Sequence, residues 1–273
     1  MTSGGEFISA VQASKTYSTR SGPVHAVQGA SFSAQEGQFI SLLGPSGCGK
    51  STLLMMLAGL ESPSSGRLVL AGEPVLGPRR DTGVVFQDAT LLPWKSVLDN
   101  VMFPVDILKL ARSEYIDRAR ELLQRVGLGG FDDKRPHELS GGMRQRVAIC
   151  RALVHDPKVL LMDEPFSALD AITRDQMNVV LSELLERYRK TVIFVTHSIR
   201  EAVYLSDRVL VMGGRPSSML LDLKIPFPRP RPFEIEETPE FSGYCRTLRL
   251  TIERGHAHAD SSGTHGALAQ ATT

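Results

Sequence analysis

The sequence predicts an α/β protein built around a parallel sheet. Three observations support this: short apolar runs typical of buried strands, helical stretches between them, and a glycine or polar residue where each run ends. The strand candidates are Phe39–Leu43, Val159–Met162 and Val192–Val195, and the helical stretch Ala171–Tyr188 separates the last two. This alternation of strand, helix and strand favours parallel pairing with right-handed crossovers.

The remaining elements follow from the same signals. Short β-like runs are expected between Phe7 and Leu43, and further strands at Gly66–Gly72 and Gly83–Phe86. Helices are expected over Ser51–Leu60, through most of Val97–Ala152, and over Arg112–Val126, where Gly127 is a plausible stop.

The C-terminal part differs in composition. Six of the 16 prolines lie between Pro216 and Pro239, and closely spaced prolines favour an extended strap over the surface. A short amphipathic helix is expected near Tyr244–Arg254. From His256 onward the chain is of low complexity, so we expect a disordered tail rather than a metal site built from His256, His258 and His265.

The overall composition excludes several classes of protein. The 273 residues are 42% apolar and 22% charged, and 31 Lys and Arg against 30 Asp and Glu leave a formal charge of +1. Such a balance argues against a broad nucleic-acid-binding surface. No apolar run approaches the roughly 18–20 residues that span a bilayer, and the N-terminus lacks the pattern of a signal peptide. Three cysteines fit a reducing compartment, so we expect a soluble intracellular protein.

A glycine-rich segment after the first buried strand matches the phosphate-loop pattern G-x-x-x-x-G-K-[ST] in full. It consists of Gly44, Pro45, Ser46, Gly47, Cys48, Gly49, Lys50, Ser51 and Thr52. The apolar strand before it and the helix after it are the context that the pattern requires. Backbone N–H groups of the loop and the N-terminus of the helix favour an anion there. Lys50 is expected to contact the β- and γ-phosphates of a nucleotide, and Ser51 to bind Mg²⁺.

Cys48 lies inside this loop and allows two interpretations. The nearby helix N-terminus and Lys50 favour a reactive thiolate. The interpretation that we prefer is a small residue that fits the loop.

Polar residues also follow the other buried strands. Asp163 is placed to hold Mg²⁺ through water, and Glu164 to orient or deprotonate an attacking water. His197 follows Val192–Val195, at the strand end where α/β proteins bind ligands, so we expect it to contact the γ-phosphate. Gln87 follows Gly83–Phe86, and its amide is expected to bind the metal or the attacking water.

A second segment suited to binding an anion lies at the start of another helix. Ser140, Gly141 and Gly142 precede the helical run that continues to Leu153. Two phosphate-binding segments in one chain are explained by a two-fold dimer, in which each nucleotide lies between the Lys50 loop of one copy and the Ser140 segment of the other. The alternative is an ordinary capped helix.

Taken together, these motifs resemble the nucleotide-binding subunits of ATP-binding cassette transporters. The Lys50 loop, Gln87, Leu139–Met143, Asp163-Glu164, the segment ending at Asp170, and His197 stand in the order of that family. The resemblance covers roughly Phe7 to Leu223. It implies a P-loop NTPase-type mixed sheet with an antiparallel β subdomain and a helical subdomain, and ATP hydrolysis with ATP and Mg²⁺ as ligands.

The resemblance also assigns roles by position. Tyr17 resembles the aromatic residue that stacks on adenine, with a half-buried strand residue as the alternative. Ser140, Gly141 and Gly142 resemble the signature that closes on the partner's γ-phosphate, Asp170 the acid that communicates across the dimer, and His197 the switch histidine. Met143 departs from the family, which commonly has Gln there; the serine hydroxyl and glycine amides remain, so we expect activity to survive.

Two segments are similar to the nitrate, sulfonate and taurine importer branch. They are the run from Ser140 to Arg146 and the run Phe86-Gln87-Asp88-Ala89-Thr90-Leu91-Leu92-Pro93-Trp94. The branch implies import of a small anion, although a separate binding protein and the membrane subunits choose it. An exporter subunit, a soluble cassette ATPase and a nucleotide-gated regulatory subunit are the alternatives.

The resemblance implies domain boundaries and partners. We expect a flexible N-terminus over residues 1–6, a cassette over 7–224 with its helical subdomain at about 88–152, a strap and short helix over 225–255, and a tail over 256–273. Implied partners are a second copy, membrane-spanning permease subunits docking near Leu91–Val101, and indirectly an extracytoplasmic solute-binding protein, with no nucleic acid. The subunit would then lie at the cytoplasmic face of the membrane.

Trp94 is expected to line the groove for a coupling helix, since Trp is favoured at interface hot spots. The alternative places it in the helical-subdomain core.

Overall fold

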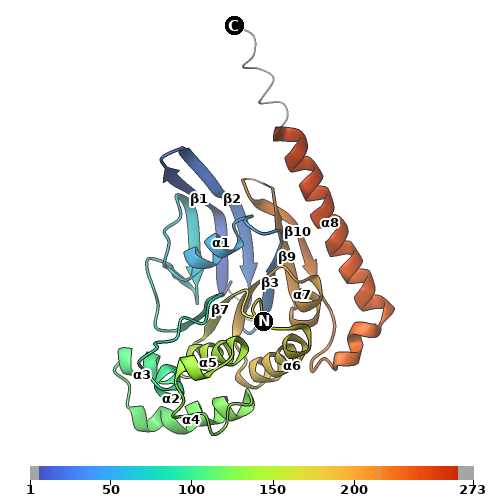
Figure 1. Cartoon of the computed structure of the whole chain (residues 1–273). Helices are drawn as coiled ribbons and strands as arrows, with labels where there is room; N and C mark the ends of the chain where they lie inside the picture. Colours follow the sequence, from blue (N-terminus) through green and yellow to red (C-terminus); the bar gives the residue numbers. More distant parts are fainter. Residues whose placement is uncertain (1–5, 215, 264–273) are drawn as a thin grey trace, which may run out of the picture. The chain divides into compact units, whose positions relative to one another are not determined.

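The computed structural model describes residues 6–214 and 216–263 (Figure 1). They form two compact units. The first unit combines both ends of the chain, residues 1–77 and 195–273, and the second comprises residues 78–194. Residues 1–5 of the expected flexible N-terminus and the last ten residues of the tail, His265 included, lie outside the described residues.

An antiparallel sheet forms one part of the first unit. Its strand order is β2-β1-β4-β5, and its strands are β1 (Ile8–Thr19), β2 (Gly22–Ala34), β4 (Ser65–Leu70) and β5 (Glu73–Pro74). The register Ile8–Ala34 to Thr19–Gly22 makes β1 and β2 a long hairpin. The short β-like runs expected before Leu43 are therefore two long strands followed by β3.

The other strands of the first unit are β3 (Phe39–Leu43), β9 (Arg208–Gly213) and β10 (Ser218–Lys224). β3 pairs in parallel with β9, and β9 pairs antiparallel with β10. All five residues of β3 are buried, as its apolar run predicts. Two short helices, α1 (Lys50–Leu57) and α7 (Ile199–Leu205), belong to the same unit.

The last helix of the first unit, α8 (Pro239–Gly263), lies along β9, β10 and α7 (Figure 1). A 3-10 turn, Phe233–Glu237, precedes it. The helix starts five residues earlier than expected, because the hydroxyl of Thr238 accepts a hydrogen bond from the Phe241 amide at 3.2 Å and Pro239 suits a first helical turn. It also continues beyond Arg254 into the segment expected to be a tail.

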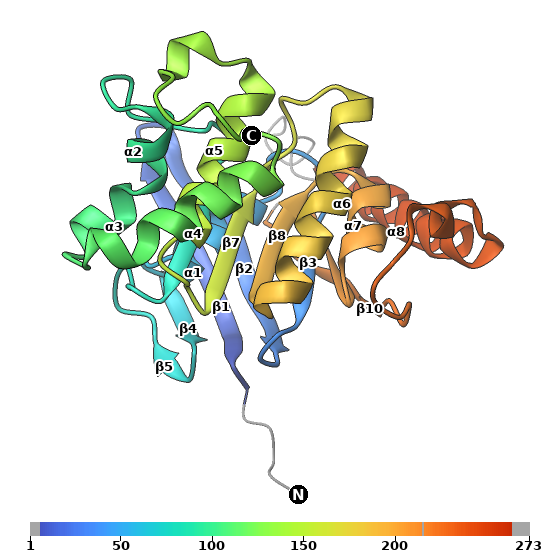
Figure 2. The ribbon, with the colours of Figure 1, turned by 90° about the horizontal axis from the view of Figure 1, so that it is seen from below.

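The second unit places β6 (Thr82–Val85), β7 (Val159–Asp163) and β8 (Thr191–Thr196) in the order β8-β7-β6. β6 and β7 are parallel. β8 begins in this unit, and its last two residues belong to the first. Its helices include α4 (Arg112–Arg125), which packs beside α5 (Gly141–Leu153), and α6 (Ala171–Tyr188) (Figure 2).

The helical stretch expected over Val97–Ala152 is divided into shorter pieces. Two five-residue helices, α2 (Val97–Val101) and α3 (Phe103–Ile107), precede α4, and a 3-10 turn over Pro136–Glu138 precedes α5. Pro104 lies in the first turn of α3 and has no amide to continue the hydrogen bonding of α2. In the described part of the chain, no helix is both long and apolar enough to cross a membrane.

Gly59 provides a test of backbone constraint in the first unit. Its φ is +70°, and a Cβ atom there would lie 2.1 Å from the carbonyl oxygen of Gly77. We expect Gly59→Ala to lower the free energy of unfolding by more than about 2 kcal/mol. Gly72→Ala is the matched control, since Gly72 has φ +78° and nothing within 4 Å of the added Cβ. Because only the positive φ opposes the substitution, Gly72→Ala should lower the free energy of unfolding by about 1 kcal/mol. Urea denaturation measures both, and equal losses would contradict the clash.

Candidate functional site

The phosphate loop connects β3 to α1 in the first unit. Lys50 is the first residue of α1, and its side chain is 4% exposed. Its ammonium donates hydrogen bonds to the carbonyl oxygens of Gly44 at 2.8 Å and Pro45 at 2.9 Å. The positive charge is therefore held within the curve of the loop. Together with the positive end of α1, this makes the loop suited to an anion.

Glycine is required at position 49. Gly49 has φ +93°, and a Cβ atom there would lie 2.4 Å from the carbonyl oxygen of Ala26 in β2. It is also the residue that caps α1. Any larger side chain would separate the loop from β2, so this close approach fixes the direction in which α1 begins.

Cys48 is buried rather than reactive. Its side chain is 3% exposed, and its sulfur lies 3.7 Å from the carbonyl oxygen of Met212 in β9. Burial raises the pKa of the Cys48 thiol above its ordinary value and outweighs the charge of Lys50, which acts in the opposite direction. The structure therefore favours the interpretation of Cys48 as a small residue that fits the loop.

His197 is the exposed residue directly after β8. The residues on both sides of His197 are connected to α7 by hydrogen bonds. The buried hydroxyl of Thr196 donates to the carboxylate of Glu201 at 2.6 Å and accepts from the Ser198 amide at 2.9 Å. Ser198 in turn caps α7 by accepting from the Glu201 amide. Sequence reasoning missed Thr196 and Glu201 as supports of His197, because only the folded loop brings their side chains together.

Tyr17 lies in β1, opposite Val24 of β2, and is partly exposed. The ammonium of Lys15 lies 5.0 Å from the centre of its ring. A cation over the ring shows that one face is electrostatically suited to a positive group. The residue thus combines a strand position with an accessible aromatic ring.

In the second unit, Asp163 ends β7 and Glu164 follows it. Asp163 is 6% exposed, which is unusual for a carboxylate. Glu164 has φ +42°, a left-handed conformation that is uncommon for a residue other than glycine. Such backbone strain is concentrated at functional sites, because the fold must hold the residue against its own preference.

Gln87 comes two residues after β6 and is exposed. The carbonyl oxygen of its neighbour Phe86 accepts a hydrogen bond from the buried amide of Gln145 at 3.0 Å. Gln145 lies on α5, so this bond connects the Gln87 segment to the helix that begins after Ser140. Sequence reasoning missed this contact, since a glutamine within an amphipathic helix has no distinctive pattern.

Ser140 caps α5, and its hydroxyl oxygen accepts from the backbone amide of Met143 at 3.2 Å. The hydroxyl hydrogen is still able to donate. Met143 contributes through its amide, so the side chain at this position is not needed for the cap. The first residues of the helix are Gly141 and Gly142, whose small size leaves their amides accessible at the positive end of α5.

Asp170 caps α6. One carboxylate oxygen accepts from the Thr173 amide at 3.0 Å, and the other accepts from the Thr173 hydroxyl at 2.7 Å. These hydrogen bonds, the amide first, lower the pKa of Asp170 below its usual value, so the carboxylate is ionised at neutral pH. Asp170 therefore has a structural role at the start of α6.

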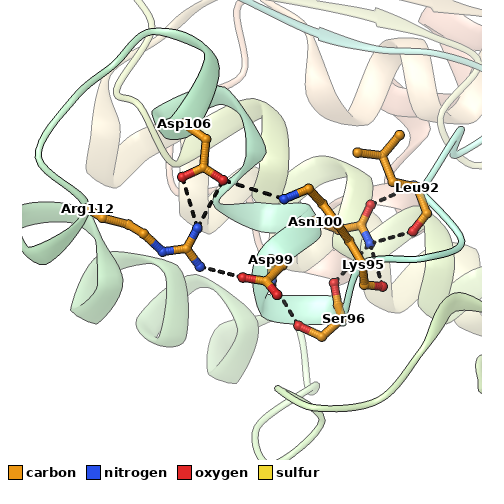
Figure 3. Close-up of polar contacts among 7 residues, drawn as sticks. All are labelled: Leu92, Lys95, Ser96, Asp99, Asn100, Asp106 and Arg112. Carbon is orange, nitrogen blue, oxygen red and sulfur yellow. Dashed lines mark hydrogen bonds and ion pairs between the residues drawn. The ribbon is translucent and has the colours of Figure 1, made fainter.

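The segment after Gln87 is held by a polar network (Figure 3). Asn100 of α2 is fully buried; its side-chain oxygen accepts from the Leu92 amide at 2.7 Å, and its nitrogen donates to the carbonyl oxygens of Leu92, Lys95 and Ser96 at 2.9–3.2 Å. One side chain thus replaces the backbone partners that an irregular loop lacks.

An ion-pair cluster supports this network (Figure 3). Arg112 donates to both oxygens of Asp106, at 2.9 and 3.0 Å, and to Asp99 at 2.5 Å, and Lys95 lies 3.7 Å from Asp106. Burial acts to raise the pKa of Asp99, but hydrogen bonds from Arg112 and Ser96 outweigh it, so the pKa lies below the usual value. The cluster joins α2, α3 and the first turn of α4.

A groove of about 400 Å³ lies within the second unit. Its apolar lining includes Phe86, Leu92, Phe103, Ile107 and Leu108. Trp94 is not among the lining residues of this cavity, and its expected contact with a coupling helix stays a prediction. The Trp94 side chain is 70% exposed, which excludes the alternative of a core position. The backbone of Trp94 is bound nonetheless, because its carbonyl oxygen accepts a hydrogen bond from Arg135.

One part of the groove is basic. Arg79, Arg80 and Arg151 line it, and none of its lining residues is acidic. Arg79 is paired with Asp81, and Arg151 donates to the carbonyl oxygens of Ala89 and Thr90. Arg80 is exposed and has no polar partner among the residues that the structure describes.

The predicted site residues are divided between the two units. Tyr17, the loop Gly44–Thr52 and His197 belong to the first, and Gln87, Ser140–Gly142, Asp163, Glu164 and Asp170 belong to the second. The first unit contributes the exposed hydroxyl of Ser51 and the second the buried carboxylate of Asp163, and oxygen atoms of both kinds are ligands that suit Mg²⁺. Mg²⁺ is usually bound by a small number of protein oxygens together with the phosphates of the substrate. Among the described residues no cluster of three His, Cys, Asp or Glu side chains is suited to a metal.

The buried thiol can be tested by alkylation. Because burial raises the pKa of Cys48 and covers its sulfur, iodoacetamide at pH 7.5 should modify it at least about 100-fold more slowly in the native protein than in urea. Cys245, which is half-buried, is the internal control and should be the first cysteine modified in the native state. Peptide mapping by mass spectrometry measures both, and equal native rates would show that Cys48 is accessible.

Comparison with known proteins identifies the family. A family model described as ABC transporter matches residues 27–167. A nitrate import ATP-binding protein of Synechococcus elongatus is 45% identical over 251 residues, which are 90% of this chain and 91% of that protein. A taurine import ATP-binding protein of Burkholderia pseudomallei is 45% identical over 220 residues, or 81% and 85% of the two chains. A solved ATP-binding cassette, dimeric in a post-hydrolysis state with ADP and phosphate, is 32% identical with a TM-score of 0.73, covering 81% of this chain and 99% of that one. The chain therefore belongs to the ABC transporter family, as an ATP-hydrolysing cassette.

Proposed function

We propose that this cassette powers the import of a small anion, such as nitrate, a sulfonate or taurine. The observation that carries the proposal is the similarity to nitrate and taurine import proteins over four-fifths or more of the chain. An aliphatic sulfonate import protein of Bacillus cereus, 41% identical over 225 residues, supports the same class. The substrate within this class is selected by other subunits.

The hydrolysis step is assigned to residues at strand ends. Lys50 and the loop amides bind the β- and γ-phosphates. Ser51, Asp163 and Gln87 would hold Mg²⁺, which would supply positive charge to neutralise the phosphates. Glu164 orients the attacking water and accepts its proton, and His197 contacts the γ-phosphate. The left-handed backbone of Glu164 supports its assignment, because such strain is concentrated at functional sites.

A second copy of the chain completes each site. The hydroxyl hydrogen of Ser140 and the amides of Gly141 and Gly142 form a donor group at a helix N-terminus, suited to the γ-phosphate bound by the other copy. Tyr17 stacks on adenine, and Asp170 lies near the dimer contact. The dimeric state of the similar solved cassette supports this arrangement. ATP binds the closed dimer better than the open one, so it shifts the equilibrium toward closure.

Membrane subunits dock at the groove of the second unit. Its apolar lining suits one face of a short amphipathic helix, and Arg80 suits an acidic residue on that helix. The exposed Trp94 lies on the same loop as Leu92 and extends the contact beyond the groove. The cassette would then lie at the cytoplasmic face of the membrane, and an extracytoplasmic solute-binding protein would act on it only through the permease subunits.

Removal of the catalytic carboxylate tests the hydrolysis step. Glu164→Gln keeps the shape of the side chain but accepts no proton, so we expect ATP turnover to fall at least about 100-fold while ATP binding is retained. Size-exclusion chromatography with MgATP should then show a trapped dimer. Glu183→Gln, at an exposed position on α6, is the control and should behave as the wild type. Normal turnover by Glu164→Gln would show that another group is the base.

Charge reversal in the groove tests the docking site. Arg80→Glu places a negative charge where an acidic partner residue is expected, so copurification with the membrane subunits should fall about tenfold or more. Nucleotide binding by the cassette alone should not change. Arg120→Glu, on the exposed side of α4 and outside the groove, controls for the change in net charge. Equal copurification of the two variants would exclude the groove as the docking site.

A further inference from the structure

The proline-rich segment over residues 225–238, which we call the strap, is anchored by a buried arginine. The side chain of Arg231 has no exposed surface. Its guanidinium donates to the carbonyl oxygens of Val203, Tyr204 and Ser206 at 2.8–3.1 Å, and to that of Phe227 at 3.2 Å. A fully buried charge is costly unless it is hydrogen-bonded, so the four bonds from the two terminal nitrogens to carbonyl oxygens make this contact a specific one.

Three of the carbonyl groups that Arg231 binds, those of Val203, Tyr204 and Ser206, lie at the C-terminal end of α7. The last carbonyls of a helix have no partner within the helix, and a positive charge is favoured beside them. Arg231 thus acts as the C-cap of α7, from a distance of more than twenty residues along the chain. Tyr204 returns the contact, because its hydroxyl donates to the carbonyl oxygen of Arg231 at 3.0 Å.

Two further contacts attach the strap to α7 and its neighbourhood. Arg229 donates to the carbonyl oxygen of Leu205 and, at 3.1 Å, to the carboxylate of Asp207. Near the other end of the helix, Arg200 forms an ion pair with Glu236, which is buried. The strap therefore contacts both the first and the last turn of α7, a helix of only seven residues.

The N-terminal end of α7 supports His197. Glu201 of α7 accepts from the Thr196 hydroxyl, and the Ser198 amide donates to that same hydroxyl oxygen. The residues before and after His197 are therefore bound to the helix that the strap holds. A shift or rotation of so short a helix moves both ends together, and His197 with them.

We propose that the strap is a positioning element for ATP hydrolysis, and that Arg231 is a positioning residue that sets His197 through α7. The inference rests on the role of His197 proposed above. It assigns a function to the proline-rich segment, for which the sequence indicates no chemistry. Every contact involved lies within the first unit.

Steady-state ATP hydrolysis by the full chain tests the proposal. Arg231→Met removes all donors, so kcat should fall about tenfold while the KM for MgATP stays within about twofold, because the phosphate loop is untouched. Arg231→Lys keeps the charge and part of the hydrogen bonding and should recover part of kcat. The matched control is Arg208→Met, which removes another arginine of the first unit, bound to Asp222 and the Ser33 carbonyl but not to α7 or the strap. It should leave kcat within about twofold of the wild type.

The proposal is overturned if Arg231→Met hydrolyses ATP at the wild-type rate, if Arg208→Met loses as much, or if the loss lies in KM alone. Circular dichroism melting sets an assay temperature at which each variant is folded. If Arg231→Met does not fold, Arg200→Gln replaces it. The side chain of Arg200 is 65% exposed, so its loss is tolerable, and breaking its pair with Glu236 should lower kcat about threefold. An unchanged kcat in that variant overturns the proposal.

A direct observation of His197 separates this proposal from the hydrolysis mechanism. Its imidazole NMR signal is assigned by its loss in His197→Ala. We expect Arg231→Met to shift that signal and Arg208→Met to leave it in place. If His197→Ala hydrolyses ATP normally, the proposed role of His197 is wrong, whereas the shift still tests whether the strap positions it. An unshifted signal in Arg231→Met contradicts the strap proposal alone.

Discussion

The complete burial of three strands is the constraint on which the chemistry of this chain depends. Every residue of β3, β7 and β8 is buried, and each strand is followed directly by a residue of the predicted site. Packing of these strands therefore fixes where the chain reaches Gly44, Glu164 and His197. Backbone features then set the direction of the chain after each strand. They are the close approach at Gly49, the left-handed conformation of Glu164 and the cap at Ser198.

Local sequence predicts those parts of the fold in which one segment determines its own structure. The strand at Phe39–Leu43 and the helix at Ala171–Tyr188 have the predicted bounds, and α4 ends one residue before its predicted end, next to Gly127 at φ +73°. The phosphate loop is predicted because its function requires a fixed spacing of residue types. Pattern and structure agree here because periodicity, loop chemistry and burial all act within a few residues.

Contacts between distant segments were not predictable in the same way. Gln145 binds the Phe86 carbonyl 59 residues away, and Arg231 caps a helix that ended at Leu205. Neither residue has a local pattern that distinguishes it from a surface glutamine or arginine. The loop that carries Trp94 is a further example, because its backbone is bound by Arg135 and, at Leu92, by Asn100, while the Trp94 side chain is 70% exposed.

The capping of α7 by Arg231 has a consequence for the order of folding during synthesis. Residues of the first unit that precede the strap leave the ribosome before it, so α7 is made while its last carbonyl groups still lack their partner. The C-terminal end of α7 can be capped only when Arg231 has left the ribosome. The segment beside His197 thus reaches its final rigidity late, and a nascent chain that has not yet extended past the strap differs from the finished one at this helix.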